Sequence, residues 1–426
     1  MFNKKYIPAK IFVCVIFLCM FGAFGALAFR KTEKALRVGE FEDYVQVEID
    51  WAKLYPFTEN KVVEFKTRLK KSKLEQVYKN ITKKAEEYTS ERLPAYMKIV
   101  ELARKYEDII KWNMSSIFTY NNLIALEDGY WTGLQKSYDA TPIIDSTVAL
   151  AEFCSERNIE FMYVQTPGKI CKYDDKKISG VLDYSNQKAD DLLKGLKAAG
   201  VKNCDLRELL HNDGMNHHDS FYKTDHHWKL ETGFWAARHI LKILREDFNW
   251  RVDENILNAE NFNFETYHNV MLGSQGKKLT LARAKVEDFV FVRPKIETSF
   301  ALNIPENGIS SSGDFMILRN SKNLIGNLKN GEILNYYADA FRDGTVMHIT
   351  NNMAKNNKKI LVLRASYSNC LLPYVAMGIK YVDAIGNGGG FVGSIQTYIE
   401  QTKPDMVMVI YNPSYIESER GAFDFR

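Results

Sequence analysis

The sequence predicts an α/β fold, with a parallel β-sheet flanked by helices, over most of the chain. From residue 116 onward, short apolar runs typical of buried strands alternate with helical patterns. Alternation of this kind favours parallel strands joined by helical crossovers, and in such sheets functional sites lie beyond the carboxyl ends of the strands. The expected strands are residues 159–164, 201–204, 360–363, 381–385 and 406–411.

The first residues of the chain are typical of an export device. Residues 11–29 form an apolar run preceded by three lysines, which is long enough to span a bilayer. We interpret residues 1–29 as an uncleaved signal anchor, a single transmembrane segment. Ala26-Leu27-Ala28 has the small-x-small form of a cleavage site, so a cleaved signal peptide and a secreted protein remain the alternative. Both interpretations place the rest of the chain outside the cytoplasm.

Two further regions follow the expected anchor. Residues 30–115 have mostly helical patterns and are expected to form a stalk or cap. Residues 116–426 contain the α/β pattern and are expected to form one large domain. Between about 250 and 350 the alternation fails, which indicates an insertion of short strands or hairpins.

Composition excludes some function classes. The formal net charge of +4 is weak for 426 residues, and the chain has no recognised nucleic-acid motif, so no nucleic-acid partner is expected. Two of the six cysteines fall in the apolar N-terminal run, and the others form no Cys-x-x-Cys pair. Cys154, Cys171, Cys204 and Cys370 could form two disulfides in an oxidising compartment. We expect them to be reduced, because Cys154, Cys204 and Cys370 lie in apolar patterns where buried thiols are common.

The segment Asp225-His226-His227-Trp228 carries the strongest chemical pattern. On an extended backbone a carboxylate and an imidazole two residues apart point the same way, whereas a helix would turn them to different faces. Helical periodicity resumes only at Leu230, so this segment is expected to be a loop ahead of a helix. Asp225 and His227 therefore have the arrangement of a base and the carboxylate that orients it.

A nucleophile for this base is expected at Ser366. The apolar run 360–363 predicts a strand and residues 370–377 a short helix, which places Ser366 on the turn between them. Such a turn exposes a hydroxyl and aims backbone N–H groups at an oxyanion. An ordinary helix N-cap serine is the alternative interpretation.

The histidines allow a competing hypothesis of a zinc site. Six of the eight histidines lie in under thirty residues, and imidazole and carboxylate groups suit zinc. The spacing lacks a helical His-x-x-x-His pair, however, and adjacent histidines on an extended backbone point to opposite faces. We therefore expect no metal or other cofactor, and a structural role for His226.

Two loops border the expected site. Residues 165–169 follow the strand 159–164 and are expected to line the same pocket as Ser366. Gly273-Ser274-Gln275-Gly276 is a small-residue turn whose backbone could approach a substrate or an oxyanion, although a plain loop is the alternative.

These motifs together resemble the DHHW proteins, which are relatives of the alginate O-acetyltransferase (SGNH hydrolase-like) proteins. The resemblance covers roughly residues 116–426, and in that family the Asp and His precede the Ser, as they do here. It implies an SGNH hydrolase-like fold in which Asp225, His227 and Ser366 carry over as a triad. It rests on Asp225-His226-His227-Trp228 with Tyr222-Lys223-Thr224 before it, Ser366-Tyr367 with Asn369 and Leu372-Pro373-Tyr374 after it, and Leu126-Glu127-Asp128-Gly129-Tyr130-Trp131.

The resemblance implies an extracytoplasmic O-acyltransferase, with acetyl as the expected group, that modifies hydroxyls of a cell-surface or cell-wall polysaccharide. The expected substrate contacts are Tyr222, Trp228, Tyr367 and Asn369. It also implies a polytopic membrane O-acyltransferase as the source of the acyl group. A carbohydrate esterase is the alternative with the same chemistry. Because the family commonly has Asp where this chain has Ala365, a non-catalytic polysaccharide-binding assembly protein is a further alternative.

Overall fold

The computed structural model describes residues 119–120, 123–126, 129–173, 183–279, 284–319, 344–386, 391, 393–416 and 421–425. The chain divides into two compact units, residues 1–104 and 105–426, and all described residues belong to the second. The expected signal anchor and most of the expected helical stalk lie in the first unit, and the whole of both lies outside the described residues. Within the described part, no helix combines the length and apolar character needed to cross a bilayer.

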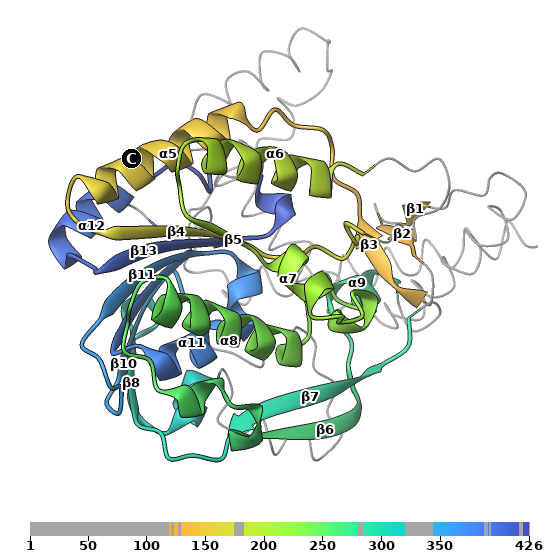
Figure 1. Cartoon of the computed structure of the whole chain (residues 1–426). Helices are drawn as coiled ribbons and strands as arrows, with labels where there is room; N and C mark the ends of the chain where they lie inside the picture. Colours follow the sequence, from red (N-terminus) through yellow and green to blue (C-terminus); the bar gives the residue numbers. More distant parts are fainter. Residues whose placement is uncertain are drawn as a thin grey trace, which may run out of the picture. The chain divides into compact units, whose positions relative to one another are not determined.

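An eight-stranded mixed sheet forms the centre of the described unit, in the order β5-β4-β13-β11-β12-β10-β8-β9 (Figure 1). The first five of these run parallel, and the last three are antiparallel to their neighbours. The strands are β4 (Glu160–Gln165), β5 (Asn203–Asp205), β8 (Phe300–Ile304), β9 (Ile309–Gly313), β10 (Val346–Asn351), β11 (Lys359–Arg364), β12 (Tyr381–Gly386) and β13 (Met406–Tyr411).

The expectation of a parallel sheet is therefore confirmed for β5, β4, β13, β11 and β12 and wrong for β10, β8 and β9. All five expected strands are present and parallel. The added strands come from the region expected to be an insertion, where β8 and β10 alternate buried with more exposed residues. An antiparallel strand can carry this alternation because one of its faces is solvated, whereas the central parallel strands β11 and β13 are apolar along most of their length because both faces are covered.

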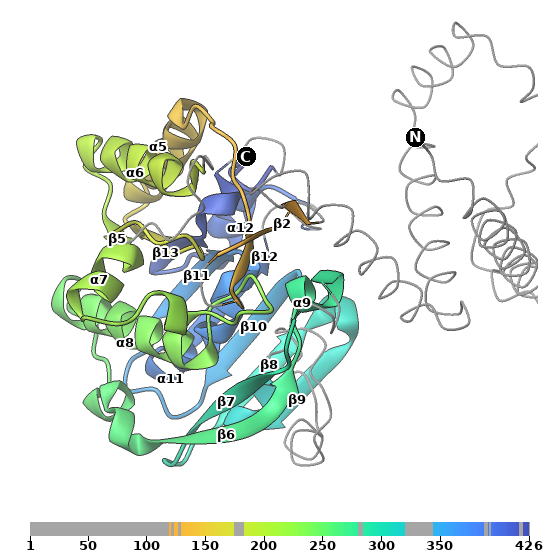
Figure 2. The same cartoon turned by 90° about the vertical axis from the view of Figure 1, so that its right-hand side faces the viewer.

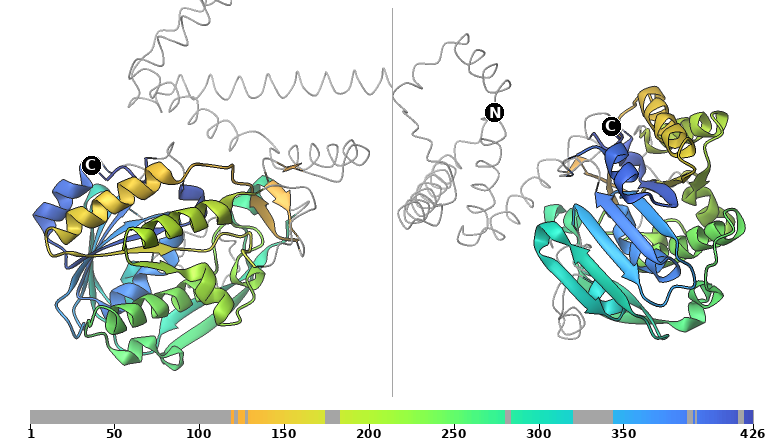
Figure 3. Two further views of the ribbon diagram at one scale, coloured as in Figure 1. Left: turned by 45° about the horizontal axis from the view of Figure 1, so that its top comes forward. Right: turned by 90° about the vertical axis from the view of Figure 1, so that its left-hand side faces the viewer.

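Helices cover both faces of the parallel strands. Leu361 and Leu363 of β11 pack in one hydrophobic cluster with α5, α6 and α12. Ile360 and Val362 face the other way and pack with α8 and α11. Figure 1 and the left view of Figure 3 show α5 on one side of the sheet and α8 on the other. The helices are α5 (Thr141–Ser155), α6 (Ser185–Ala198), α7 (Leu206–Asn212), α8 (Leu230–Glu246), α11 (Leu372–Gly378) and α12 (Ile395–Thr402).

A hairpin and a small sheet complete the described unit. Strands β6 (Phe262–Met271) and β7 (Glu287–Pro294) pair antiparallel, with helix α9 (Ser274–Leu279) at one end (Figure 2). The hairpin packs on α8, where the rings of Phe262 and Phe234 lie 4.4 Å apart. The small sheet contains β1 (Thr119–Tyr120), β2 (Leu123–Ala125) and β3 (Trp131–Gly133). Short 3₁₀ helices are η4 (His218–Ser220), η5 (Glu254–Leu257), η6 (Ala259–Asn261), η7 (Pro305–Asn307), η8 (Phe315–Leu318), η10 (Ser366–Cys370) and η11 (Pro413–Tyr415).

The cysteines of the described unit behave as expected. Cys154, Cys171, Cys204 and Cys370 are all buried, and none of them forms a disulfide. Burial raises the pKa of the Cys154 and Cys204 thiols to about 12, so neither is a reactive thiolate at neutral pH.

Candidate active site

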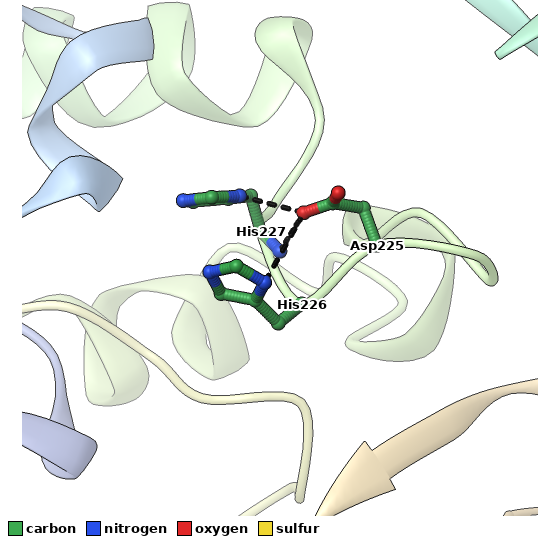
Figure 4. Close-up of side chains that lie close together, drawn as sticks. All are labelled: Asp225, His226 and His227. Atoms are coloured by element: carbon green, nitrogen blue, oxygen red, sulfur yellow. Dashed lines mark hydrogen bonds and ion pairs between the residues drawn. The ribbon is translucent and has the colours of Figure 1, made fainter. Parts of the chain in front are cut away.

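The structure brings Asp225, His227 and Ser366 into one chain of hydrogen bonds. His227 Nδ1 lies 2.6 Å from Asp225 Oδ1, and His227 Nε2 lies 2.8 Å from Ser366 Oγ. Asp225 and His227 are fully buried, while Ser366 is only partly buried. Figure 4 shows the carboxylate facing the imidazole. This is the order of acid, base and hydroxyl that activates a serine.

Ser366 stands at the carboxyl end of β11, where the chain turns into η10. A 3₁₀ helix leaves its first backbone N–H groups without partners inside the helix, and here these belong to Ser366 and Tyr367. The turn therefore presents the Ser366 hydroxyl beside two N–H groups that have no partner within η10.

Ala365, just before this turn, is an extended residue whose N–H donates to the Ile410 carbonyl of β13 at 3.2 Å. Its side chain is buried in the same hydrophobic cluster as Leu361 and Leu363. A carboxylate at this position would point into an apolar layer, where burial is costly. Alanine suits this environment and leaves the Ser366–His227 contact intact.

The carboxylate of Asp225 is fixed by backbone donors. Oδ1 accepts the His227 N–H at 3.0 Å, and Oδ2 accepts the Ser274 N–H at 2.8 Å. Burial alone would raise the pKa of Asp225, but the charge and hydrogen bond of His227, helped by the charge of His226 and the Ser274 N–H, outweigh it and lower that pKa. Asp225 is therefore ionised at neutral pH.

Gly273 explains how the Ser274 N–H can come so close. A Cβ on Gly273 would stand 2.3 Å from Asp225 Cβ and 2.4 Å from its Oδ2, closer than any side chain tolerates. A Cβ on Gly276 would likewise stand 2.8 Å from Thr224 Cβ. The glycine turn considered for a substrate or an oxyanion instead approaches the loop that carries the acid.

A second group of contacts holds this loop from the other side, through Glu287 at the start of β7. The Glu287 carboxylate accepts the N–H groups of Lys223 and Thr224, each at 2.7 Å, and the Thr224 hydroxyl at 2.5 Å. The Gly276 N–H donates to the Thr224 carbonyl at 2.7 Å. Sequence reasoning missed Glu287, because nothing in its local pattern separates it from a surface carboxylate.

His226 lies beside the triad but is not part of the hydrogen-bond chain. Its Nδ1 lies 3.1 Å from Ser274 Oγ and 3.5 Å from Asp225 Oδ1. Desolvation, then the charge of His227, lowers the pKa of His226, although 43% of its side chain is exposed. Asp225, His226 and His227 place possible ligand atoms within 4.8 Å of one another. Both ring nitrogens of His227 already serve Asp225 and Ser366, so a metal ion would have to displace the triad contacts.

The triad opens into a cavity of about 540 Å³. The loop after β4 contributes Gly168 and Lys169, which confirms the expectation that this loop borders the Ser366 pocket. Most of the wall is polar but uncharged, and no Asp or Glu belongs to the described lining residues. The polar lining residues are Thr132, Gln135, Ser185, His226, Gln275, Ser366, Tyr367, Asn412 and Ser414, and Lys278 adds a charged side chain.

The structure places the four expected substrate contacts differently. Tyr367 lines the cavity. Trp228 is fully buried and donates its indole N–H to the Tyr367 carbonyl at 2.9 Å. Tyr222 is also fully buried, stacked on Phe289, and the Asn369 side chain accepts a hydrogen bond from Arg364 at 2.6 Å. Trp228, Tyr222 and Asn369 lie behind the wall because they pack the core that supports the two catalytic segments.

Comparison with known proteins agrees with this fold. Residues 139–285, which include Asp225 and His227, match the family model of the SGNH hydrolase-like domain of acetyltransferase AlgX. The structure of PatB1 from Bacillus cereus is similar, with 21% identity and a TM-score of 0.60. The match covers 71% of this chain and 99% of that chain. The structure of a DHHW family protein from Eubacterium siraeum is also similar, with 13% identity and a TM-score of 0.54. The match covers 73% of this chain and 97% of that chain. Comparison with curated proteins gave no match. The resemblance predicted from the sequence is thus confirmed: residues 139–285 match the SGNH hydrolase-like domain model, and the fold is similar to those of PatB1 and a DHHW family protein.

Proposed function

We propose that this protein transfers acyl groups, with acetyl as the expected group, to hydroxyls of a cell-surface or cell-wall polysaccharide through an acyl-enzyme on Ser366. The observation that carries the proposal is the continuous chain from Asp225 through His227 to Ser366, with contacts of 2.6 and 2.8 Å. The acetyltransferase family model matched by residues 139–285 supports acetyl as the group.

In the first half-reaction Ser366 Oγ attacks the acyl carbonyl while His227 Nε2 takes the hydroxyl proton. Asp225 holds the opposite ring nitrogen and stabilises the imidazolium that forms. The N–H groups of Ser366 and Tyr367 stabilise the oxyanion, at about 3 to 4 kcal/mol for each well-aligned donor. His227 then gives its proton to the departing group, and the acyl group is left on Ser366.

In the second half-reaction a sugar hydroxyl gives its proton to His227 and attacks the acyl carbonyl. His227 Nε2 then returns that proton to Ser366 Oγ as the bond between Ser366 and the acyl group breaks. Transfer in water requires an acceptor held in position, a gain of about 7 to 11 kcal/mol in favourable cases. The polar, carboxylate-free wall of the 540 Å³ cavity supports this step, because neutral donors and acceptors suit hydroxyl groups.

We further propose that the site works outside the cytoplasm, anchored by residues 1–29, and that a polytopic membrane O-acyltransferase supplies the acyl group. These proposals rest on the apolar N-terminal run and on the family resemblance.

A carbohydrate esterase is the second candidate, and the partial exposure of Ser366 favours it, because water can also reach the acyl-enzyme. The non-catalytic alternative rested on Ala365. Its burial in an apolar layer, with Ser366 still in contact with His227, weakens that alternative.

The experiment that separates the candidates follows the fate of the acyl group. The purified protein is incubated with an aryl acetate and with oligosaccharides from cell-surface glycans, and acetylated sugar and free acetate are measured by mass spectrometry. Transfer product in excess of acetate is the expected result. Acetate alone with every acceptor would favour the esterase, and neither product would favour the binding protein.

A further inference from the structure

Lys169 is a buried lysine in the loop after β4, and only 3% of it is exposed. Its ammonium group contacts three segments that are far apart in the sequence. Nζ lies 2.7 Å from the Trp131 carbonyl of β3, 3.1 Å from the Lys223 carbonyl and 2.6 Å from Gln275 Oε1 of α9. These three segments and the Lys169 loop together surround one side of the active-site cavity.

These contacts use all the donors that Lys169 has. An ammonium group carries three N–H bonds and accepts none, so three acceptors leave nothing for a substrate. All three acceptors are neutral, and the charges that balance the ammonium are the nearby carboxylates of Asp225 and Glu287. Burial lowers the pKa of Lys169 to about 7, although these carboxylates oppose the shift. A buried lysine whose three N–H groups all reach acceptors of the protein connects segments of the protein rather than binding a ligand.

Two of the three segments are the ones that fix Asp225. Lys223 lies two residues before it, in the loop that Glu287 also holds. Gln275 follows Ser274, whose N–H donates to Asp225 Oδ2. A shift of either segment would therefore move the carboxylate and, with it, the imidazole of His227.

We propose that Lys169 is a positioning residue for the triad, which connects the Asp225 loop and the Ser274 turn to strand β3. This inference rests on the proposed function, since it assigns a role within that site. With its three donors directed to Trp131, Lys223 and Gln275, Lys169 acts through the segments that it contacts.

The test is Lys169→Met, which keeps the length of the side chain and removes its donors. Without the ammonium group the Asp225 loop is released, and we expect kcat for an aryl acetate to fall by roughly 10- to 100-fold, the scale of a displacement of about 1 Å. The KM should change little, because Lys169 has no donor free for the substrate. The rate at which a sulfonyl fluoride labels Ser366 should fall in parallel.

Lys359→Met is the matched control. Lys359 also connects distant elements, with Nζ 3.1 Å from the Thr402 carbonyl of α12 and 3.3 Å from Asp383 Oδ2 of β12, but at the opposite end of β11 from Ser366. We expect this variant to lose some thermal stability and to keep the kcat and the Ser366 labelling rate of the wild type.

If Lys169→Met does not fold, Gln275→Met tests the inference instead, because it removes one of the three acceptors of the Lys169 ammonium group. A loss of kcat is again expected, and in a double variant that folds the two losses should be far from additive. Wild-type kcat in either folded variant would overturn the inference while leaving the proposed function intact. If the wild type itself is not labelled at Ser366, both proposals fail together.

Discussion

The two catalytic segments are held in place in different ways. Ser366 follows β11, a central strand with both faces buried, and the regular structure on either side sets its position. Asp225 and His227 lie on a loop between η4 and α8. This loop is held by contacts from Lys169, Glu287 and the glycine turn 273–276, and by Tyr367, whose hydroxyl donates to the His226 carbonyl. The nucleophile is therefore placed by local sequence, whereas the acid and base are placed by residues that are distant in the sequence. Substitutions of the residues that contact this loop should therefore lower catalysis more than they lower stability.

The largest effect is expected within the triad itself. Ser366→Ala and His227→Ala should each lower ester hydrolysis by several orders of magnitude, because they remove the nucleophile or its base. Ser368→Ala is the control. Its hydroxyl belongs to the same turn but donates to the Ala365 carbonyl at 2.7 Å, so only stability should change. Hydrolysis that survives in Ser366→Ala would assign the nucleophile elsewhere.

The second-largest effect is expected where the glycine turn contacts the Asp225 carboxylate. Gly273→Ala places a methyl group 2.3 Å from Asp225 Cβ, so the turn and the carboxylate must separate. We expect kcat to fall by roughly 100-fold, as for other displacements of about 1 Å. Gly386→Ala is the matched control, because its added Cβ meets nothing closer than 3.9 Å. Equal activity of the two variants in steady-state assays would mean that the loop does not depend on the turn.

A moderate effect is expected at Glu287. Glu287→Ala leaves the N–H groups of Lys223 and Thr224 without their acceptor, and we expect a loss of about 1 to 3 kcal/mol in the free energy of unfolding. Glu265→Ala removes a partly exposed carboxylate paired with Arg293, for which a loss below about 1 kcal/mol is typical. Urea titrations compare the two. A smaller loss at Glu287 than at Glu265 would contradict the assigned role.

The smallest effect is a dependence of stability on pH. The pKa of Asp225 is lowered in the folded protein, so its ionised form contributes stability above the ordinary carboxyl pKa of about 3.9, and this contribution is lost as the pH falls towards the folded value. The difference in unfolding free energy between the wild type and Asp225→Asn should therefore shrink on acidification below about pH 4. A difference that stays constant from neutral to acid pH would show that the carboxylate is not stabilised in the fold.

The same contrast explains what the sequence could predict. The parallel strands and the Ser366 turn follow from local apolar runs, and the Asp225–His227 pair from its two-residue spacing. Glu287 and Lys169 carry no local pattern, since their roles depend on chain segments that meet only in the folded protein. The antiparallel strands were assigned to an insertion because β8 and β10 are half exposed and lack a continuous apolar run. The burial of Trp228 and Tyr222 likewise depends on packing that residue type alone does not reveal.

The central claim, an acyl-enzyme on Ser366, can be tested by intact mass spectrometry. The protein is mixed with an aryl acetate and quenched in acid within the first turnover, and the modified peptide is then sequenced. We predict a protein that carries one added acetyl group on Ser366, and no added group on Ser366→Ala or His227→Ala. An active wild-type protein that never carries an acetyl group, or carries it on another residue, would contradict it.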